Sequence, residues 1–242
     1  MTRSRIIIAA ALVVGGTTLF GTGGATGAPT YTCFGQTATL VGTPGDDLLV
    51  GRDGVADVIV GRGGDDEIRA AEDVFAGGSP GDRLCGGRGA DFIRGAVGED
   101  RVRGGGGNDN VDGSFSLDWV TRGGPGNDRV ADCDSEFDGG VRRISGGAGD
   151  DDLCVDTDAT RMRGGVGNDV LTDLVCGTDS RLSGGDGDDR LMSSVDSFEG
   201  TTCSDPFFDF LDADRVRGGE GNDDAVVNEG DVVTGTENVV RE

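Results

Sequence analysis

The stretch Gly86-Gly87-Arg88-Gly89-Ala90-Asp91-Phe92-Ile93-Arg94 sets the architecture of this chain. It follows the pattern Gly-Gly-x-Gly-x-Asp-x-U-x, in which U is a large apolar residue. Further unbroken copies of this nine-residue pattern begin at Gly104, Gly123, Gly146, Gly164 and Gly184. A phrase that recurs at a fixed period predicts a solenoid of stacked coils instead of one compact core.

The copies form two alternating series, which we call the A side and the B side. Every A-side copy has Gly at its fourth place and Asp at its sixth, and these copies begin at Gly42, Gly61, Gly86, Gly104, Gly123, Gly146, Gly164, Gly184 and Gly218. The B side carries loops with Asp only early in the chain, at Gly51 to Val60, Gly77 to Cys85 and Gly95 to Arg103. Later B-side segments keep only a short strand, so insertions are expected there.

The short strands indicate an all-β fold. In Arg101-Val102-Arg103 and Arg161-Met162-Arg163 the central apolar residue points inward and its neighbours outward. We therefore expect a parallel β-roll, or β-solenoid, with two short strands per coil and a thin core where the U residues meet. The expected domains are an N-terminal cap at 29–41, the roll with its B-side insertions at 42–226, and a C-terminal cap at 227–242.

The first 28 residues are typical of a secretory signal peptide. Arg3 and Arg5 precede the apolar run Ile6 to Val14, and small residues follow to Ala28. This run is too short to span a bilayer. The pattern predicts export and an extracellular protein, with no membrane insertion.

The six cysteines predict disulfide bonds, because their number is even and the chain is expected to be exported. No Cys-x-x-Cys pair is present, which disfavours zinc or thioredoxin-type chemistry. Adjacent coils are close enough for disulfide geometry. From the coil register we hypothesise the pairs Cys33–Cys85, Cys133–Cys154 and Cys176–Cys203.

Composition excludes several functions. The formal charge is −24, and all 21 basic residues are Arg. Such a chain repels nucleic acid, and a phosphate-binding P-loop needs a Lys that is absent. Without His, nucleophilic triads are excluded or remote. Paired acids such as Asp46-Asp47 repeat along the chain, so none is singled out for glycoside hydrolysis. We expect no enzyme, no catalytic residues and no organic cofactor; a hydrolase is the least favoured alternative.

The loop chemistry points to calcium. A carboxylate in a glycine loop offers hard oxygen ligands, and the loop's backbone carbonyls offer more. Ca²⁺ takes six to eight oxygens in flexible geometry, whereas Mg²⁺ is stricter and softer metals prefer His or Cys. Stacked carboxylates on a glycine-rich backbone are costly to order alone. We therefore expect multiple Ca²⁺ ions to bridge stacked loops and to drive folding.

The repeat resembles the calcium-binding nonapeptide of the RTX, or hemolysin-type, repeat proteins secreted by bacteria. The resemblance covers about residues 42 to 226. It implies that six residues of each repeat form a loop and three a strand, with calcium between loops of successive coils. The A-side ligands it implies are Asp47, Asp66, Asp91, Asp109, Asp128, Asp151, Asp169, Asp189 and Asp223. Asp57, Asp82 and Asp100 are weaker B-side candidates.

Two points limit the resemblance. Toxins and proteases of that family use a C-terminal export signal and carry a catalytic or pore-forming domain, for which this chain has no room. Their activity is therefore not carried over. Nine A loops leave eight gaps for ions, and the insertions before Gly86, Gly146 and Gly218 are places where the register could break.

A column of arginines on the B strands allows two interpretations. Outward positions of the B strands carry Arg83, Arg101, Arg143, Arg161, Arg181 and Arg215, with Arg103, Arg163 and Arg217 beside them. The favoured interpretation is that these cations offset the aspartate loops, in a structural or interaction module. The alternative is a cell-surface or matrix adhesin that binds an anionic glycan through this stripe.

Overall fold

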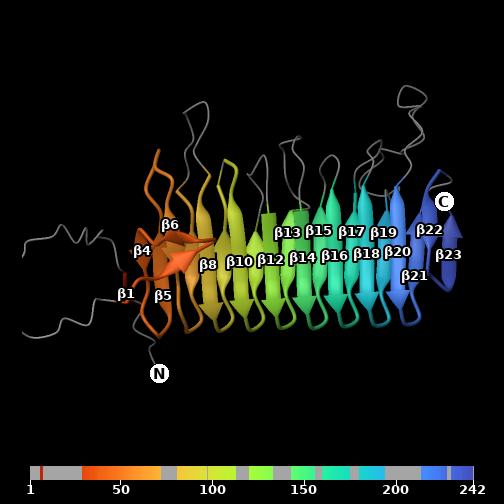
Figure 1. The fold of residues 1–242 in the computed structure, drawn as a ribbon, viewed down its shortest axis with the longest axis horizontal. Helices are drawn as coiled ribbons and strands as arrows, with labels where there is room; N and C mark the ends of the chain where they lie inside the picture. Colours follow the sequence, from red (N-terminus) through yellow and green to blue (C-terminus); the bar gives the residue numbers. More distant parts are fainter. Residues whose placement is uncertain are drawn as a thin grey trace, which may run out of the picture.

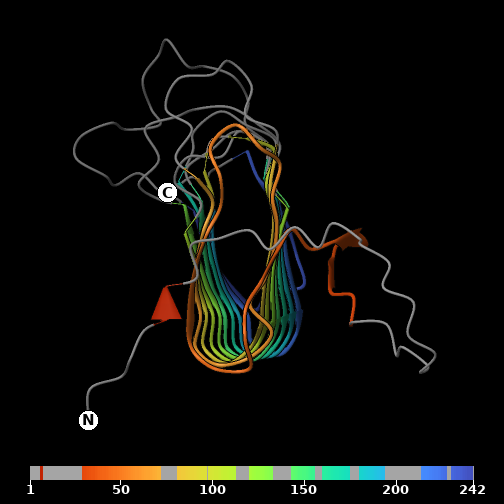
Figure 2. The ribbon, with the colours of Figure 1, turned by 90° about the vertical axis from the view of Figure 1, so that its left-hand side faces the viewer.

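The computed structural model has strands and no helix in the part of the chain that it describes. The described residues are 6–7 (backbone only), 29–71, 81–96, 98–112, 120–132, 143–155, 160–174, 180–193, 214–227 and 230–241. Their strands stack side by side along one axis (Figure 1). Seen along that axis, two sheets face each other and join through tight turns at one edge (Figure 2). The predicted parallel β-roll is confirmed.

Two long parallel sheets and one small hairpin contain all the described strands. The eleven-stranded sheet consists, in spatial order, of β1 (Ile6–Ile7), β5 (Asp47–Val50), β7 (Glu67–Arg69), β9 (Phe92–Arg94), β11 (Asn110–Asp112), β13 (Arg129–Asp132), β15 (Asp152–Val155), β17 (Val170–Asp173), β19 (Arg190–Ser193), β21 (Asp224–Val227) and β23 (Asn238–Arg241). The ten-stranded sheet consists of β4 (Leu40–Val41), β6 (Val58–Val60), β8 (Arg83–Arg88), β10 (Arg101–Gly106), β12 (Val120–Pro125), β14 (Arg143–Ala148), β16 (Arg161–Val166), β18 (Arg181–Asp186), β20 (Arg215–Glu220) and β22 (Val232–Thr234). The hairpin pairs β2 (Thr32–Cys33) with β3 (Gln36–Thr37) in antiparallel orientation.

The core is a single layer of apolar side chains between the two sheets. In the eleven-stranded sheet, Val111 lies opposite Ile93 on one side and Val130 on the other. In the ten-stranded sheet, Leu84 and Val102 pair in the same way. All five side chains are fully buried, and each such side chain contributes about 1.5–3 kcal/mol through its removal from water. The U positions therefore do meet inside the roll.

The A-side turns are shorter than the six residues expected. The strand β10 runs through Gly104 and Gly105 to Gly106, so the first three residues of the repeat belong to the sheet. Strand β11 begins at Asn110, which leaves only residues 107–109 for the turn. Gly105 and Gly107 have φ of +133° and +123°, values that side chains disfavour. The glycines thus let strand β10 lead directly into the tight turn at 107–109, which is shorter than a β-turn.

The N-terminal end of the roll is joined to the hairpin by a disulfide. Cys33 in β2 is bonded to Cys85 in β8, with an S–S distance of 2.11 Å, as hypothesised from the register. Cys154 is also disulfide-bonded; its expected partner Cys133, and the expected pair Cys176–Cys203, lie outside the described residues.

Both segments expected to be caps contribute strands to the stack. At the N-terminal end β4 pairs with β6, and at the C-terminal end β22 pairs with β20 and β23 with β21. Val232, Val239 and Val240 in the last two strands are exposed. Of the expected signal peptide, the structure describes only β1, which pairs with β5.

Candidate cation sites

The sixth-position aspartates of the A side form one ladder. Each follows its turn and immediately precedes, or begins, a strand of the eleven-stranded sheet. The backbone N–H of Asp109, for example, donates to Oδ1 of Asp128 on the next coil at 2.9 Å. The same hydrogen bond, at 2.8 to 3.0 Å, joins the pairs Asp47–Asp66, Asp66–Asp91, Asp91–Asp109, Asp128–Asp151, Asp151–Asp169, Asp169–Asp189 and Asp189–Asp223.

This ladder continues across every insertion. Asp66 reaches Asp91 across 25 residues and Asp189 reaches Asp223 across 34 residues, with the geometry unchanged. The register break that the insertions before Gly86, Gly146 and Gly218 suggested does not occur. At the C-terminal end the N–H of Asp223 donates to Oε2 of Glu237 at 2.7 Å. Glu237, which has no glycine-rich repeat around it, is a carboxylate that the motif did not reveal.

The ladder is buried and carries no counter-charge. All nine aspartates have 5% or less of their surface exposed. One carboxylate oxygen of each has no hydrogen-bond partner: Oδ1 of Asp47, and Oδ2 of the eight others. None of the nine forms an ion pair with a described arginine. Leaving such a carboxylate buried and uncompensated is costly, so the arrangement requires a bound cation or a proton.

The first glycine of each repeat makes room for the free oxygen. A Cβ atom at Gly104 would overlap Oδ2 of Asp109, its own repeat's aspartate. Gly123 and Asp128 have the same relation. A Cβ at Gly105 would in turn meet the carbonyl oxygen of Gly87 on the preceding coil. The aspartate carboxylate and the carbonyl of the preceding coil therefore occupy the space that a side chain on the first or second glycine would need.

Burial raises the pKa of most ladder carboxyls. It raises the pKa of Asp66, Asp91, Asp109 and Asp151 to about 7. It raises the pKa of Asp128, Asp169 and Asp189 to about 6. The hydrogen bond that each accepts from the preceding coil opposes this shift, and for most of them a neighbouring aspartate adds to it. Without a cation, several ladder members hold protons near neutral pH.

A second ladder runs along the tip of the A turns. The residue before each aspartate is Asp or Asn in all but one A-side copy, and its side-chain oxygen accepts from the next coil. The N–H of Asn127 donates to Oδ1 of Asn108 at 2.9 Å, and Asp188 donates likewise to Asn168 at 2.9 Å. These residues are exposed. They are Asp46, Asp65, Asn108, Asn127, Asp150, Asn168, Asp188 and Asn222. The motif writes this place as x, so it did not reveal the regularity.

The three B-side candidates lie in a ladder of their own at the opposite edge. The N–H of Asp57 donates to Oδ1 of Asp82 at 2.7 Å, and that of Asp82 to Oδ1 of Asp100 at 2.8 Å. Burial acts to raise the pKa of Asp57, but hydrogen bonds from Arg52, at 2.6 Å from Nη2 to Oδ1, outweigh it and lower that pKa. Burial raises the pKa of Asp100. Arg52 thus supplies at Asp57 the positive charge that the A side lacks.

A B-side ladder is also present in the later coils, where the B-side sequence no longer follows the glycine-rich motif. The N–H of Thr160 donates to Oγ of Ser180 at 3.1 Å, Ser180 to Oδ1 of Asp214 at 2.7 Å, and Asp214 to Oδ1 of Asp231 at 3.0 Å. These four residues are buried. Each stands directly before a strand, as Asp82 and Asp100 do. Sequence reasoning missed them because a hydroxyl or carboxyl without surrounding glycines gives no recognisable repeat.

These donors suit a hard cation better than any other group. The A side offers oxygen ligands alone, from carboxylates and backbone carbonyls, and no His or thiol stands near. Among the described residues no three carboxylates converge on one point. An ion between two coils would therefore take carboxylates from neighbouring repeats and complete its shell with carbonyls or water, which Ca²⁺ accepts.

A family comparison agrees with this chemistry. The model of the RTX calcium-binding nonapeptide repeat matches residues 37–68, 55–84, 86–116, 178–196 and 211–233, which together span half of the chain. The chain belongs to this family. The resemblance drawn from the motifs is confirmed, and the RTX repeats with their β-roll support a calcium-binding repeat module.

Other comparisons add no relative. The chain matches no curated protein and no solved structure. In the described part of this RTX chain, no helix is long and apolar enough to cross a membrane.

Proposed function

We propose that Ca²⁺ binds in the gaps between successive A-side turns and that binding drives the roll to fold. The observation that carries this proposal is the A-side ladder, in which nine buried carboxylates stand in register without a counter-charge. Nine turns leave eight gaps, and the unbroken register supports using all of them. Each ion would neutralise carboxylates that otherwise oppose stacking.

The proposed ligands are the sixth-position aspartates of neighbouring coils and the backbone carbonyls of the glycine turns. Asp47 to Asp223, as named above, fill this role on the A side. Asp82 and Asp100 are secondary candidates on the B side. Asp57 is the least suited, because Arg52 already neutralises its carboxylate. When bound, Ca²⁺ supplies positive charge and a flexible coordination shell, and the turns supply its position.

The setting proposed for this module is extracellular. The leader at 1–28 directs export, and the four later cysteines form the pairs Cys133–Cys154 and Cys176–Cys203. Calcium is abundant outside cells and scarce within them, so the chain folds after export. The module acts structurally or as an interaction surface, without catalysis. Its domains are the caps at 29–41 and 227–242 and the roll at 42–226.

Circular dichroism of the exported chain with and without a chelator tests the coupling. We expect a weak β-signal in the chelator and a cooperative gain as Ca²⁺ reaches millimolar levels. Mg²⁺ at the same concentration serves as the control and should give little, because its strict octahedral geometry suits the shared turns poorly. A reduced sample is compared in parallel, since the disulfides hold part of the chain together. An unchanged β-signal on adding Ca²⁺ to both samples would refute the proposal.

A further inference from the structure

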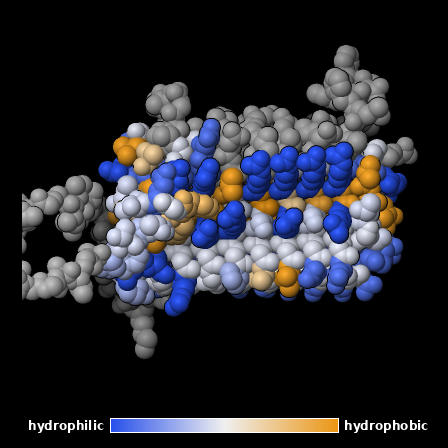
Figure 3. Space-filling model, viewed as in Figure 1, coloured by the Kyte–Doolittle hydropathy of each residue, from blue (hydrophilic) through white to orange (hydrophobic). Residues whose placement is uncertain are grey.

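One face of the roll is covered by exposed arginines that point outward from the ten-stranded sheet. We call it the arginine face, and it consists of Arg101, Arg103, Arg122, Arg143, Arg161, Arg163, Arg181, Arg215 and Arg217. Strand register places Arg143, Arg161, Arg181 and Arg215 directly beside one another on four successive strands. Neighbouring strands lie about 4.8 Å apart. Figure 3 shows the resulting rows of hydrophilic side chains above a pale glycine band.

These arginines lack acidic partners, in contrast to several of the other sheet, although Arg103 lies over the ring of Phe34 at 5.1 Å. None of the nine forms an ion pair in the described part of the chain. On the eleven-stranded sheet, by comparison, Arg94 pairs with Asp112 at 2.8 Å and Arg129 contacts Asp152 at 3.8 Å. The described strands of the ten-stranded sheet carry acids only at their turn ends, Asp186 and Glu220.

Charge balance alone does not explain this arrangement. Like charges directly opposite each other on neighbouring strands destabilise a sheet, and the eleven-stranded sheet shows that the same fold accommodates alternating signs. If the arginines served only to balance the negative charge of the aspartate turns, acids placed among them on the same sheet would remove the repulsion between neighbouring arginines. The arginine face therefore retains a feature that opposes folding, which is typical of a binding surface.

We propose that the arginine face binds a linear acidic polysaccharide, with carboxylate or sulfate groups along the polymer meeting successive arginines. A straight row of cations at a fixed spacing matches an extended chain with a charge on each sugar. Planar guanidinium groups bind such oxyanions through paired hydrogen bonds. The strands of this sheet contain no aromatic residue among those described, so bases have no stacking platform as in single-stranded nucleic-acid sites.

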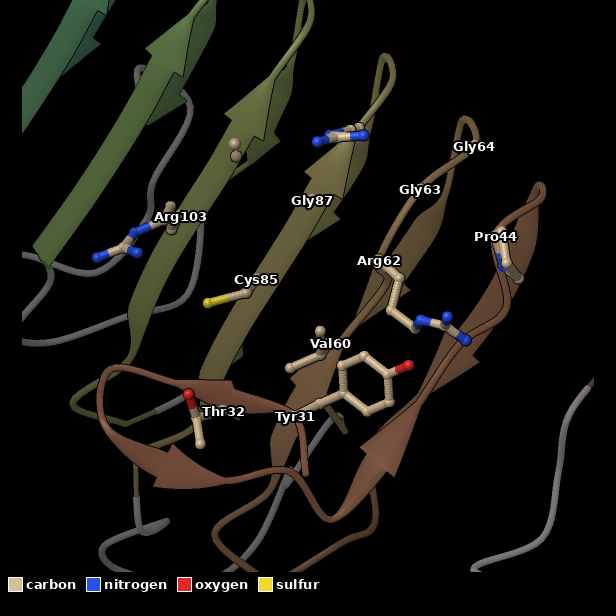
Figure 4. Close-up of a pocket in the computed structure, with 13 residues that line it drawn as sticks. Tyr31, Thr32, Pro44, Val60, Arg62, Gly63, Gly64, Cys85, Gly87 and Arg103 are labelled. Carbon is tan, nitrogen blue, oxygen red and sulfur yellow. The ribbon is translucent and has the colours of Figure 1, made fainter. Parts of the chain in front are cut away.

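A groove lies at the N-terminal end of the arginine face. It has a volume of about 640 Å³, and the hairpin residues Tyr31 and Thr32 form one wall. Arg62, Arg88 and Arg103 also line it. The guanidinium of Arg62 lies 4.6 Å from the ring centre of Tyr31, and Figure 4 shows the two side chains beside each other. The groove extends the row of cations and adds an aromatic side chain at its edge.

Affinity for heparin, a linear polysaccharide charged on nearly every sugar, tests this surface in the Ca²⁺-folded protein. The variant R143T/R161T/R181T/R215T removes four neighbouring charges from the arginine face. Its matched control, R69T/R94T/R129T/R190T, removes four from the other sheet and gives the same net charge. We expect the Kd at low salt to rise about tenfold or more in the first variant and to change little in the control, because exposed ion pairs are individually weak but add up in a row.

Stability and the choice of polymer complete the test. With Ca²⁺, the arginine-face variant should unfold at equal or higher denaturant concentration than the parent, since it loses like-charge repulsion. A Lys variant at the same four positions gives the readout if the Thr variant does not fold. It keeps the charge but loses the paired hydrogen bonds, so we expect its Kd to rise about threefold, and an unchanged Kd would overturn the proposal. The proposal is overturned if both Thr variants lose equal affinity. It is also overturned if the parent binds heparin no better than neutral dextran, or binds single-stranded DNA or anionic vesicles more tightly.

The surface is independent of the proposed calcium chemistry. If the parent protein folds in Ca²⁺ but does not bind heparin, the surface proposal alone is contradicted. If Ca²⁺ induces no β-signal, the folding proposal alone is contradicted.

Discussion

Neighbouring glycines of one repeat differ in how closely they approach the adjacent coil. Gly105 has φ of +133°, and a side chain there would strike the carbonyl of Gly87 on the adjacent coil. Gly106, the next residue, has open space around it and an ordinary backbone conformation. The third place of the repeat accordingly holds Arg, Pro, Ala, Val, Asp or Glu in other copies. From the Gly86 copy onward glycine holds the second place, where coils touch, whereas the first two copies have Thr43 and Arg62 there.

Substitution of these two glycines should have opposite results. We expect G105A to destabilise the calcium-bound protein by about 1–3 kcal/mol, because Ala disfavours the positive φ. G106A should be neutral or stabilise by about 0.4–1 kcal/mol, because it restricts only the unfolded chain. Urea unfolding of both variants in saturating Ca²⁺ measures the difference. Equal losses in the two variants would contradict the stacked-turn geometry.

Two adjacent aspartates provide a similar comparison for ion binding. Asp151 belongs to the buried ladder, whereas Asp152 is exposed and points outward. D151N keeps an oxygen to accept the N–H of Asp128 but loses the charge, so we expect the Ca²⁺ concentration at the folding midpoint to rise about twofold or more. D152N removes the same charge and should leave the midpoint nearly unchanged. A calcium titration followed by circular dichroism distinguishes them, and coincident midpoints would argue against ladder ligation.

The A-side ladder as a whole couples folding to pH. The seven carboxyls from Asp66 to Asp189 have a higher pKa in the roll than the value near 3.9 of an unfolded chain. A carboxyl with a raised pKa favours the folded state while it is protonated. Its contribution is therefore complete below about pH 4 and is lost as pH rises through 6 to 7. Under the proposed calcium chemistry, protons and Ca²⁺ compensate the same buried charges by different means.

Metal-free protein should consequently be more folded in mild acid. We expect the β-signal without Ca²⁺ to be larger at about pH 5 than at about pH 8, because the ladder titrates between these values. With Ca²⁺ present the trend reverses, since the ion needs deprotonated ligands and displaces protons on binding. Circular dichroism across this range, with and without Ca²⁺, measures both trends. A metal-free signal that grew with pH would contradict the ladder's raised pKa.

The sequence predicts the ladder residues only where glycines at fixed places surround them. The A-side aspartates were identifiable because six or more copies share glycines at fixed places, and those glycines are needed for close stacking. Glu237, Thr160, Ser180 and Asp214 occupy equivalent rungs without that requirement. Their role follows from strand register, which a single sequence does not fix once insertions of varying length intervene. For the same reason the continuity of the ladder across Gly218 was not predictable.

The whole molecule is a one-dimensional stack, in which each coil contacts mainly its neighbours. Its strand pairs run from β1 and β4 at one end to β22 and β23 at the other, each strand pairing with those of the adjacent coils. Stability in such a stack is nearly a sum of local terms. The disulfide Cys33–Cys85 encloses the first coils in a loop of 52 residues, so its effect belongs to that end.

Removal of this disulfide should weaken the roll unevenly. In C33S/C85S we expect the first coils to lose about 2–5 kcal/mol of local stability, the usual contribution of a native disulfide. Amide hydrogen exchange in calcium should accelerate in β5 to β8 and stay unchanged in β14 to β18. Uniform acceleration along the chain would instead indicate one cooperative unit, contrary to the expectation for a stack of coils.

The hydrogen bond from Asp189 to Asp223 spans 34 residues, yet its length of 3.0 Å is close to the 2.9 Å of one that spans 18. Segment length on the B-side edge can thus vary while the A-side ladder stays constant. Doubling such a segment costs only about 0.6 kcal/mol of loop closure. The stretch between Ser193 and Asp214 is accordingly a suitable place to graft a foreign peptide. Related proteins can also vary in length there without changing the A-side ladder.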